Sequence, residues 1–218
     1  MSDIVIIGGH GKVALLAAPL PRDAGHAVTS VVRNPDHAAD VEAAGATPLV
    51  LDVESASVDD LAAAFAGRDA VVWSAGAGGG DPRRTQAVDR DAAIRAIDAA
   101  ARAGVRRFVM VSYFGAGPDH GVPRDNPFFA YAEAKAAADE HLRASDLDWT
   151  VLGPASLTTD APTGRIDVAP LAADREPKQV PRADVARTIV AALAHRESIG
   201  RTIEYVAGET PIDEVFAA

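Results

Sequence analysis

The fold is decided by Ile4-Val5-Ile6-Ile7-Gly8-Gly9-His10-Gly11-Lys12-Val13-Ala14 at the N-terminus. The first four of these residues are apolar and β-branched, which is typical of a parallel strand buried on both faces. Gly8 then permits a tight turn, Gly11 lets the backbone approach a pyrophosphate, and Ala14 allows a helix to pack closely on the sheet. The start of that helix offers free N–H groups to phosphates. Glycine-rich turns also simply join strands to helices, but the strand before this turn and the helix after it favour a dinucleotide-binding turn.

Short apolar runs alternate with alanine-rich segments along most of the chain. The apolar runs, which predict strands, lie at residues 4–7, 28–32, 48–51, 70–73, 108–111 and 149–152. The predicted helices lie at residues 12–24, 35–44, 58–66, 85–103 and 130–144, and glycines close four of these segments, as left-handed residues often do. Strands that alternate with helices form right-handed βαβ units. The sequence therefore predicts the α/β class, with a Rossmann-type, doubly wound parallel sheet.

Two regions depart from this pattern. Pro19 and Pro21 fall inside the first predicted helix, so we expect that helix to kink or stop near Ala18. Residues 153–181 are rich in proline and threonine and show no periodic pattern, apart from a candidate strand at residues 165–168.

The length of 218 residues fits one α/β domain. We expect a single domain over residues 1–218, with the core of the Rossmann domain at residues 1–153. Residues 154–218 would add a small substrate-side extension, which contains a last amphipathic helix and a late strand at residues 201–206.

The composition excludes several classes of function. The chain has no cysteine, and its six histidines show no metal-ligand spacing, so we expect no metal site. With 21 basic and 31 acidic side chains, and a net charge of −10, the chain lacks the basic surface that nucleic-acid binding needs. No apolar run is long enough for a signal peptide or a membrane span. We expect a soluble, cytoplasmic protein whose partner is a small-molecule substrate.

The end of the second predicted strand indicates which dinucleotide binds. An NAD-selective site has a carboxylate about 20 residues beyond the glycines, where it binds the ribose 2′-hydroxyl. Here the strand is followed by Arg33 and Asn34, and a guanidinium group matches a 2′-phosphate in charge and geometry. The sequence therefore favours NADP(H) over NAD(H). The alternative is a solvated arginine at the end of a strand.

Two further segments are expected at the cofactor. Asp52 follows the third predicted strand and is a candidate acceptor for the adenine amino group, or else it caps the next helix. Ser74-Ala75-Gly76 follows the fourth predicted strand and is expected against the ribose. The full set of predicted cofactor-binding residues is Gly8, Gly9, His10, Gly11, Lys12, Val13, Arg33, Asn34, Asp52, Val53, Ser74, Ala75, Gly76 and Lys135.

Several motifs together resemble one family. They are the glycine turn, Arg33, residues 73–78, Val88-Asp89-Arg90-Asp91, Val111-Ser112, Tyr131 with Lys135, residues 147–154 and residues 181–186. The chain resembles, over nearly its whole length, the atypical short-chain dehydrogenase/reductases, in particular the small single-domain group near the NmrA-like and flavin-reductase-like proteins. The resemblance implies a catalytic tyrosine that exchanges a proton with the substrate oxygen, a lysine that also holds the nicotinamide ribose, and a serine that orients the same oxygen. These roles would fall to Tyr131, Lys135 and Ser112.

Tyr131 and Lys135 lie four residues apart, so a helix places them on one face. A free tyrosine has a pKa of about 10 and is a poor acid–base group at neutral pH. A nearby ammonium group favours the phenolate and lowers that pKa. The alternative is structural: Tyr131 continues the aromatic pair Phe128-Phe129, and Lys135 is a solvated charge among Glu133, Asp139 and Glu140. Tyr113 is an alternative candidate for the position assigned to Ser112.

These features lead to two main hypotheses. The first is an NADP(H)-dependent oxidoreductase that transfers hydride to or from a small carbonyl, quinone or other conjugated acceptor, with one proton donor from the protein. The second is an NADP(H)-binding sensor without turnover, as the NmrA-like relatives suggest. A nucleotide-sugar epimerase is disfavoured, because the chain after Gly153 is short for a substrate domain.

Overall fold

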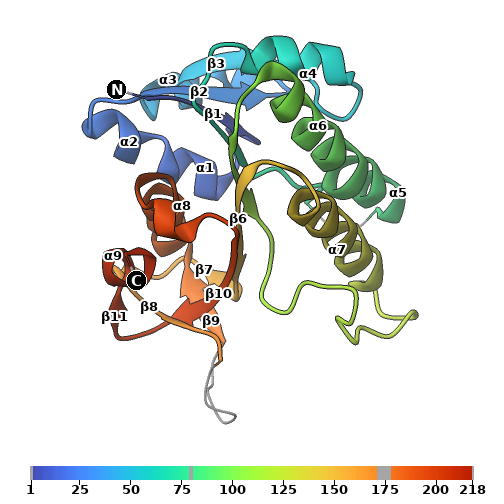
Figure 1. Ribbon diagram of the computed structural model, residues 1–218, viewed down its shortest axis with the longest axis vertical. Coiled ribbons are helices and arrows are strands. Elements are labelled where there is room, and N and C mark those ends of the chain that lie inside the picture. Colours follow the sequence, from blue (N-terminus) through green and yellow to red (C-terminus); the bar gives the residue numbers. More distant parts are fainter. Residues whose placement is uncertain (1, 79–80, 171–177, 218) are drawn as a thin grey trace.

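The structure is a computed structural model that describes residues 2–78, 81–170 and 178–217. Helices cover both faces of a central sheet (Figure 1). The strands are β1 (Asp3–Ile7), β2 (Ala27–Val32), β3 (Thr47–Val50), β4 (Ala70–Trp73), β5 (Arg107–Val111), β6 (Asp148–Pro154), β7 (Ser156–Thr158), β8 (Arg165–Val168), β9 (Gln179–Pro181), β10 (Arg201–Ala207) and β11 (Thr210–Pro211).

The helical elements alternate with the first strands, as predicted. The α-helices are α1 (Lys12–Ala17), α2 (Pro19–Asp23), α3 (Ala38–Ala43), α4 (Val58–Phe65), α5 (Pro82–Thr85), α6 (Ala93–Ala103), α7 (Phe129–Arg143), α8 (Arg182–Ala194) and α9 (Ile212–Phe216). Two 3-10 turns, η1 (Pro35–His37) and η3 (Arg196–Ser198), and a π-helical segment, η2 (Gln86–Ala92), complete the set for the described residues.

Nine of the described strands form one sheet, in the order β11-β8-β10-β6-β5-β4-β1-β2-β3. The pairs from β3 through to β10 are parallel, and β8 is antiparallel to both β10 and β11. The strand order reverses between β1 and β4, because β2 and β3 follow on one side and β5 and β6 on the other. The predicted Rossmann-type, doubly wound sheet is therefore confirmed.

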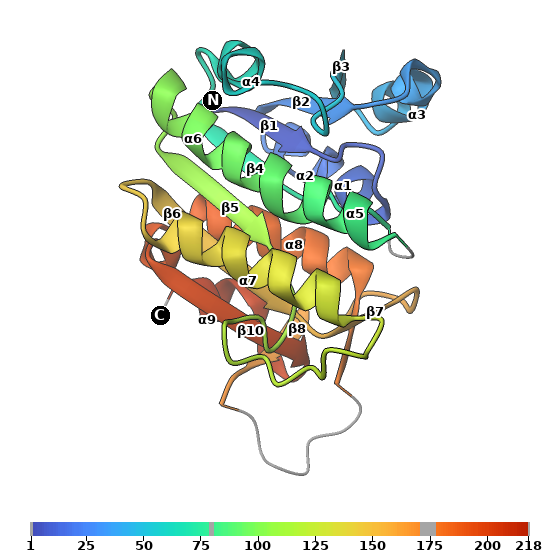
Figure 2. The ribbon, with the colours of Figure 1, turned by 90° about the vertical axis from the view of Figure 1, so that its right-hand side faces the viewer.

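Alternate residues of β1 point to opposite faces of the sheet and into two hydrophobic clusters. Ile4 and Ile6 pack with residues of α1 and α8, whereas Val5 and Ile7 pack with residues of α4 and α6. Figure 2 shows α5, α6 and α7 side by side in front of the sheet. Both faces of β1 are thus buried, as its continuous apolar run predicted.

The first predicted helix stops where expected. α1 ends at Ala17, Ala18 is both the C-cap of α1 and the N-cap of α2, and Pro19 is the first residue of α2. Proline is well tolerated at this position because the first N–H of a helix has no intrahelical partner. The predicted helix at residues 85–103 is continuous from α5 to α6, but it contains the π-helical turn η2.

The region at residues 153–181 contains more structure than the sequence predicted. The candidate strand at residues 165–168 is present as β8, and β7 and β9 additionally form a small parallel sheet. β11 and α9 near the C-terminus were also not predicted. These elements have two to five residues each, too few for a hydrophobic period to be recognised.

In the part of the chain that the structure describes, no helix has the length and apolar character of a membrane span. Nor does any cluster of three or more histidine or acidic side chains there have a geometry that could hold a metal ion.

Arg107, at the start of β5, connects four segments. It lies at the amino-terminal edge of the parallel sheet, opposite to the edge formed by the carboxyl ends of the strands. Its guanidinium group donates to the carbonyl of Asp148 at 2.6 Å, to Thr150 Oγ1 at 2.8 Å, to the carbonyl of Ala192 at 2.7 Å and to Ser198 Oγ at 3.0 Å. Burial lowers the pKa of Arg107 to about 10, so the group remains protonated at neutral pH. β5, β6, α8 and η3 therefore share one charged hydrogen-bond centre.

Replacing Arg107 with methionine should destabilise the protein by about 2–4 kcal/mol, because several buried acceptors would lose their donor. Urea unfolding measures this free energy. Arg106→Met is the matched control, since the Arg106 side chain is 64 % exposed and its ion pair with Asp148 is a surface pair, which typically contributes less than about 1 kcal/mol. Equal losses in the two variants would contradict the assignment.

Candidate functional site

The turn after β1 lies against two neighbouring strands because its residues have no side chains. Gly8 has φ +81°, and a Cβ there would lie 2.6 Å from the Cα of Ala75. A Cβ on Gly9 would lie 2.5 Å from the Cβ of Ser30 on β2. Gly11 has an ordinary φ of −63° as the N-cap of α1. Packing therefore requires glycine at the first two positions, whereas Gly11 leaves bare backbone toward the cavities above it.

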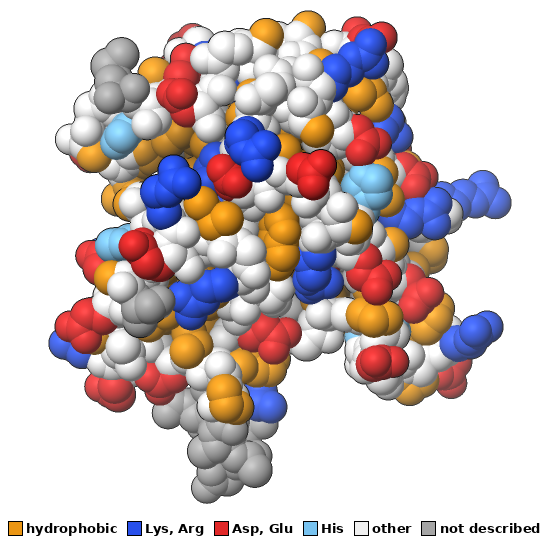
Figure 3. Space-filling model, viewed as in Figure 1, with side chains coloured by type: hydrophobic (Ala, Val, Ile, Leu, Met, Phe, Trp, Pro, Cys, Tyr) orange, Lys and Arg blue, Asp and Glu red, His pale blue; other side chains and the backbone are white. Residues whose placement is uncertain are grey.

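Two cavities, of about 710 and 360 Å³, lie over the carboxyl ends of the parallel strands. Gly11 and Ser74-Ala75-Gly76 line both, so the two cavities form one groove across the point where the strand order reverses. Open α/β sheets bind ligands at this point. Figure 3 shows this part of the molecule hollowed between the segment before α7 and the C-terminal strands. We call the smaller cavity the adenosine side and the larger the nicotinamide side, after the ligand that the glycine turn predicts.

Most of the predicted cofactor residues line the adenosine side. They are Gly8, Gly9, His10, Gly11, Arg33, Asn34, Asp52, Val53, Ser74, Ala75 and Gly76. Lys12 and Val13, at the start of α1, line the nicotinamide side. His37, Glu54, Arg84 and Val88 also line the adenosine side, and sequence reasoning had not assigned them to it.

Two arginines flank one carboxylate on the adenosine side. Arg33 Nη1 lies 3.5 Å from Glu54 Oε2, and Arg84 Nε lies 3.4 Å from the same oxygen. Arg84 also donates to the carbonyl of Ala77 at 2.7 Å. The sequence did not indicate Arg84, because it reaches the groove from α5, which lies 50 residues further along the chain than Arg33.

Asn34 and Asp52 each close a local turn. Asn34 Oδ1 accepts from the N–H of Asp36 at 3.1 Å, and Asp52 Oδ1 accepts from the N–H of Glu54 at 3.0 Å. The next helix, α4, is capped by Ser57, so the alternative that Asp52 caps it is wrong. The adenine contact of Asp52 stays a prediction.

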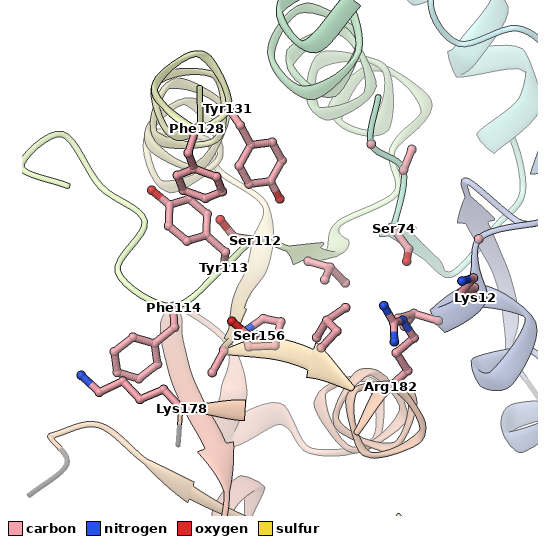
Figure 4. A pocket seen from close by; sticks show the side chains of 18 residues that line it. Lys12, Ser74, Ser112, Tyr113, Phe114, Phe128, Tyr131, Ser156, Lys178 and Arg182 are labelled. Atoms are coloured by element: carbon pink, nitrogen blue, oxygen red, sulfur yellow. The ribbon is translucent and has the colours of Figure 1, made fainter. Parts of the chain in front are cut away.

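Aromatic side chains form one wall of the nicotinamide side (Figure 4). Ring centroids are 5.2 Å apart for Tyr113 and Phe128, 5.1 Å for Phe128 and Tyr131, and 5.6 Å for Tyr113 and Tyr131. Tyr131 thus belongs to an aromatic cluster, as the structural alternative held, and it also lines the cavity. Ser112 lines the same cavity, as do Phe114, Lys178 and Arg182, which the sequence did not single out.

Lys135 lies behind this wall. Its side chain is only 1 % exposed, and its ammonium group donates to the carbonyl of Val111 at 2.8 Å and lies 3.5 Å from the sulfur of Met110. It is not among the residues that line either cavity. The alternative of a solvated lysine is therefore wrong, and the ammonium group faces the end of β5 rather than the open groove.

The expectation that Lys135 lowers the pKa of Tyr131 is also wrong. Burial raises the pKa of Tyr131, and the carboxylates of Asp89 and Asp139 raise it further. The same two carboxylates interact with the Lys135 ammonium group and compensate its positive charge. That charge therefore does not lower the pKa of the Tyr131 phenol. Tyr131 therefore keeps its proton at neutral pH, and its hydroxyl can donate a hydrogen bond into the cavity.

Asp139 and Asp89 complete a buried polar cluster around Lys135. The Ser112 hydroxyl donates to Asp139 Oδ2 at 2.5 Å, and the N–H of Ala77 donates to Asp89 Oδ2 at 3.0 Å. Burial raises the pKa of both carboxyl groups. Asp89 sits in the π-helical turn η2, and such turns often occur at functional sites. No sequence pattern predicted this cluster, because acidic residues on helices are usually exposed to solvent.

The chain matches a model of the NAD(P)H-binding family over residues 8–196, and it belongs to that family. The matched region includes the glycine turn and every residue that lines the two cavities. A nicotinamide dinucleotide fits the groove, because Gly11 leaves bare backbone at its centre and no acidic side chain is among the described residues that line the nicotinamide side.

Relatives cover the whole chain. The Bacillus subtilis protein called "Uncharacterized sugar epimerase YhfK" is 36% identical over 216 residues, which are 98% of each chain. A solved structure of a Bacillus halodurans protein, provisionally named NAD-dependent epimerase/dehydratase, has a TM-score of 0.90 and 32% identity, and the match covers 99% of each chain. The oxidoreductase ylbE of Lactococcus lactis has a TM-score of 0.82 and 27% identity, over 98% of this chain and 94% of that chain.

Gly11→Val should abolish tight dinucleotide binding and leave the fold intact. The backbone of Gly11 has an ordinary φ, and a Cβ would lie 3.0 Å from the Gly8 carbonyl oxygen and 3.8 Å from that of Ser74, whereas the valine methyl groups would occupy the groove. We expect the affinity for NADPH to fall at least tenfold, or about 1.4 kcal/mol, by calorimetry. Gly117→Val is the control, because a Cβ there meets nothing within 4 Å. Unchanged NADPH binding in Gly11→Val would place the phosphates elsewhere.

Proposed function

We propose that this chain is an NADP(H)-dependent oxidoreductase of the short-chain dehydrogenase/reductase type, which reduces a flat, conjugated acceptor such as a quinone or a ring-conjugated carbonyl. The observation that carries the proposal is the single groove, which joins a dinucleotide-binding turn to a cavity walled by aromatic rings and by hydroxyl groups, among them those of Ser112 and Tyr131. The bound nicotinamide supplies the hydride.

The charges of the groove support the binding of an anionic dinucleotide. Lys12 and Arg182 approach the cavity from the N-terminal ends of α1 and α8 (Figure 4). Both side chains are placed to neutralise a pyrophosphate beside the bare backbone of Gly11. On the adenosine side, Arg33 and Arg84 together present two guanidinium groups, which suit a 2′-phosphate better than a ribose hydroxyl.

The lining of the nicotinamide side supports an acceptor that is flat and largely apolar. Besides the aromatic wall it contains Pro154, Ala155 and Leu157, and its described residues include no carboxylate or carboxamide side chain. A sugar would need several such groups to satisfy its hydroxyls. Aromatic rings instead stack on conjugated ligands. Tyr131, which keeps its proton, would orient the acceptor oxygen by donating a hydrogen bond to it.

Two other functions, an epimerase and a sensor, would give different results in the experiments below. The names of the Bacillus subtilis and Bacillus halodurans relatives favour an epimerase, which would act on a nucleotide sugar. The absence of carboxylate and carboxamide side chains from the described lining of the nicotinamide side argues against that substrate class. A sensor would bind NADPH without turnover, and it would have no use for the Ser112 and Tyr131 hydroxyls at the nicotinamide side.

Arg33→Ala should reduce the preference for NADPH over NADH. The loss of charge-assisted hydrogen bonds to the 2′-phosphate should cost about 1.5–3 kcal/mol in NADPH binding, while NADH binding should change little. Titration of both cofactors by intrinsic fluorescence measures this. Arg83→Ala removes the same charge from an exposed position next to Arg84 and serves as the control. Equal affinities for the two cofactors in the wild type, unchanged in Arg33→Ala, would exclude the NADP(H) assignment.

Wild-type protein should oxidise NADPH faster with quinones, flavins and aryl aldehydes than with small aliphatic ketones, because only the former cover the aromatic wall. Absorbance at the NADPH band follows this reaction, with nucleotide sugars as a parallel set of substrates. Interconversion of a nucleotide sugar without net loss of NADPH would favour the epimerase. Tight NADPH binding without turnover of any acceptor would favour the sensor.

A further inference from the structure

A buried carboxyl group lies behind the lining of the nicotinamide side. Ser112 lines the cavity, and behind it Asp139 on α7 is 0 % exposed. The Ser112 hydroxyl and Asp139 Oδ2 are 2.5 Å apart, a distance typical of a charge-assisted O–H···O bond. The other oxygen, Asp139 Oδ1, is buried and has no hydrogen-bond partner in the described part of the chain. The Ser112 hydroxyl group thus lies between Asp139 and the cavity.

We propose that Asp139 supplies the proton of the reduction through Ser112, so that the Ser112 hydroxyl is the group that protonates the acceptor. This inference rests on the proposed reductase function. Ser112 is then the catalytic residue of the pair, and Asp139 is a positioning residue that acts through it. Tyr131 orients the acceptor by donating a hydrogen bond to its oxygen.

The step balances in protons and electrons. The hydride from NADPH brings two electrons to the acceptor, and a new O–H bond forms between the acceptor oxygen and the Ser112 hydroxyl proton. When Asp139 is protonated, Oδ2 donates to Ser112 Oγ across this 2.5 Å contact, and the Ser112 hydroxyl proton is free to turn toward the acceptor. Ser112 Oγ takes the proton of Asp139 Oδ2 in the same step, so that serine is restored and Asp139 becomes a carboxylate. After the product leaves, water can enter the cavity that Ser112 lines, and the reverse path returns a proton from water to Asp139.

The surroundings of Asp139 allow it to hold a proton and to lose it. Burial raises its pKa, whereas Lys135 and Arg143 on its own helix and the hydrogen bond from Ser112 lower it. Tyr113 after β5 and Tyr131 on α7 both interact with its charge, and Asp89 from η2 shares Lys135 with it. The carboxylic acid is thus favoured by burial, and Lys135 stabilises the carboxylate that forms when the proton leaves.

Asp139→Asn tests the relay, because the amide keeps the size of the side chain and can donate to Ser112 Oγ but carries no transferable proton. We expect kcat to fall by about 10²- to 10⁴-fold, the usual contribution of general acid catalysis. KM and the Kd for NADPH should stay within about threefold. In the wild type kcat should fall as the pH rises through the pKa of Asp139, and this limb should be absent from Asp139→Asn. Glu140→Gln, which removes the same charge from the next, exposed residue, is the control.

A titration of the cofactor-free protein gives a readout independent of turnover. Carbon-13 NMR of the aspartate carboxyl groups should show Asp139 titrating above the ordinary aspartate value of about 3.9. Ser112→Ala should raise the pKa of Asp139 further, because it removes a hydrogen bond that lowers this pKa. A pKa at or below the ordinary value, or no response to Ser112→Ala, would overturn the proposal.

The kinetic outcomes separate this inference from the proposed function. If the wild type reduces acceptors and Asp139→Asn keeps its kcat and pH profile, only the relay is wrong. If Asp139→Asn loses NADPH affinity and thermal stability together with kcat, the role of Asp139 is structural and the relay is again wrong. If the wild type reduces no acceptor, the proposed function fails and the relay fails with it.

Discussion

The site depends on one close contact, between the bare backbone of the turn after β1 and the end of β4. Any side chain on Gly8 would meet the backbone of Ala75 at less than 3 Å, so this contact exists only with glycine. Because the turn can lie so close, α1 begins directly above the place where the strand order reverses. The groove is the space left over between this helix start and the segment that follows β4. A bulkier turn would lift α1 and close that space.

Three ionisable side chains are buried together at the end of β5, which is costly in free energy. Lys135, Asp89 and Asp139 cannot each be charged and isolated there, because the desolvation of a lone ion costs several kcal/mol. Hydrogen bonds from other segments stabilise these groups: Lys135 donates to the carbonyl of Val111, the N–H of Ala77 donates to Asp89, and Asp139 pairs with Ser112. Two carboxylates around one ammonium group leave an excess of negative charge, which favours keeping one proton. The cluster is therefore the setting in which the proposed relay would hold its proton.

The sequence predicted the fold well and the site in part, for physical reasons that differ between elements. The strands and helices of the Rossmann core could be predicted because their apolar periods and glycine stops are local, and so could the break at Ala18, because proline acts on its own neighbours. The turn at Gly8 and Arg33 follow strands directly, and their place in the groove is set by that position. Arg84 and Lys178 could not be found in this way, because they reach the groove from distant segments. Asp139 could not be found because an acidic residue on a helix is usually exposed, and its burial depends on the packing of α7. The role expected for Lys135 depended on the direction of one side chain, which spacing along a helix does not determine.

The placement of the charges explains how a chain with a net charge of −10 can take an anionic ligand. Five cations, Lys12, Arg33, Arg84, Lys178 and Arg182, line the described part of the groove. Glu54 lies between Arg33 and Arg84 and holds both guanidinium groups in place at 3.5 and 3.4 Å. These partly exposed ion pairs are each worth less than about 1 kcal/mol, whereas charge-assisted hydrogen bonds to a phosphate are worth about 1.5–3 kcal/mol. A 2′-phosphate can therefore replace Glu54 as the partner of the two arginines. A ribose hydroxyl has no charge, so it would leave both arginines paired with the carboxylate.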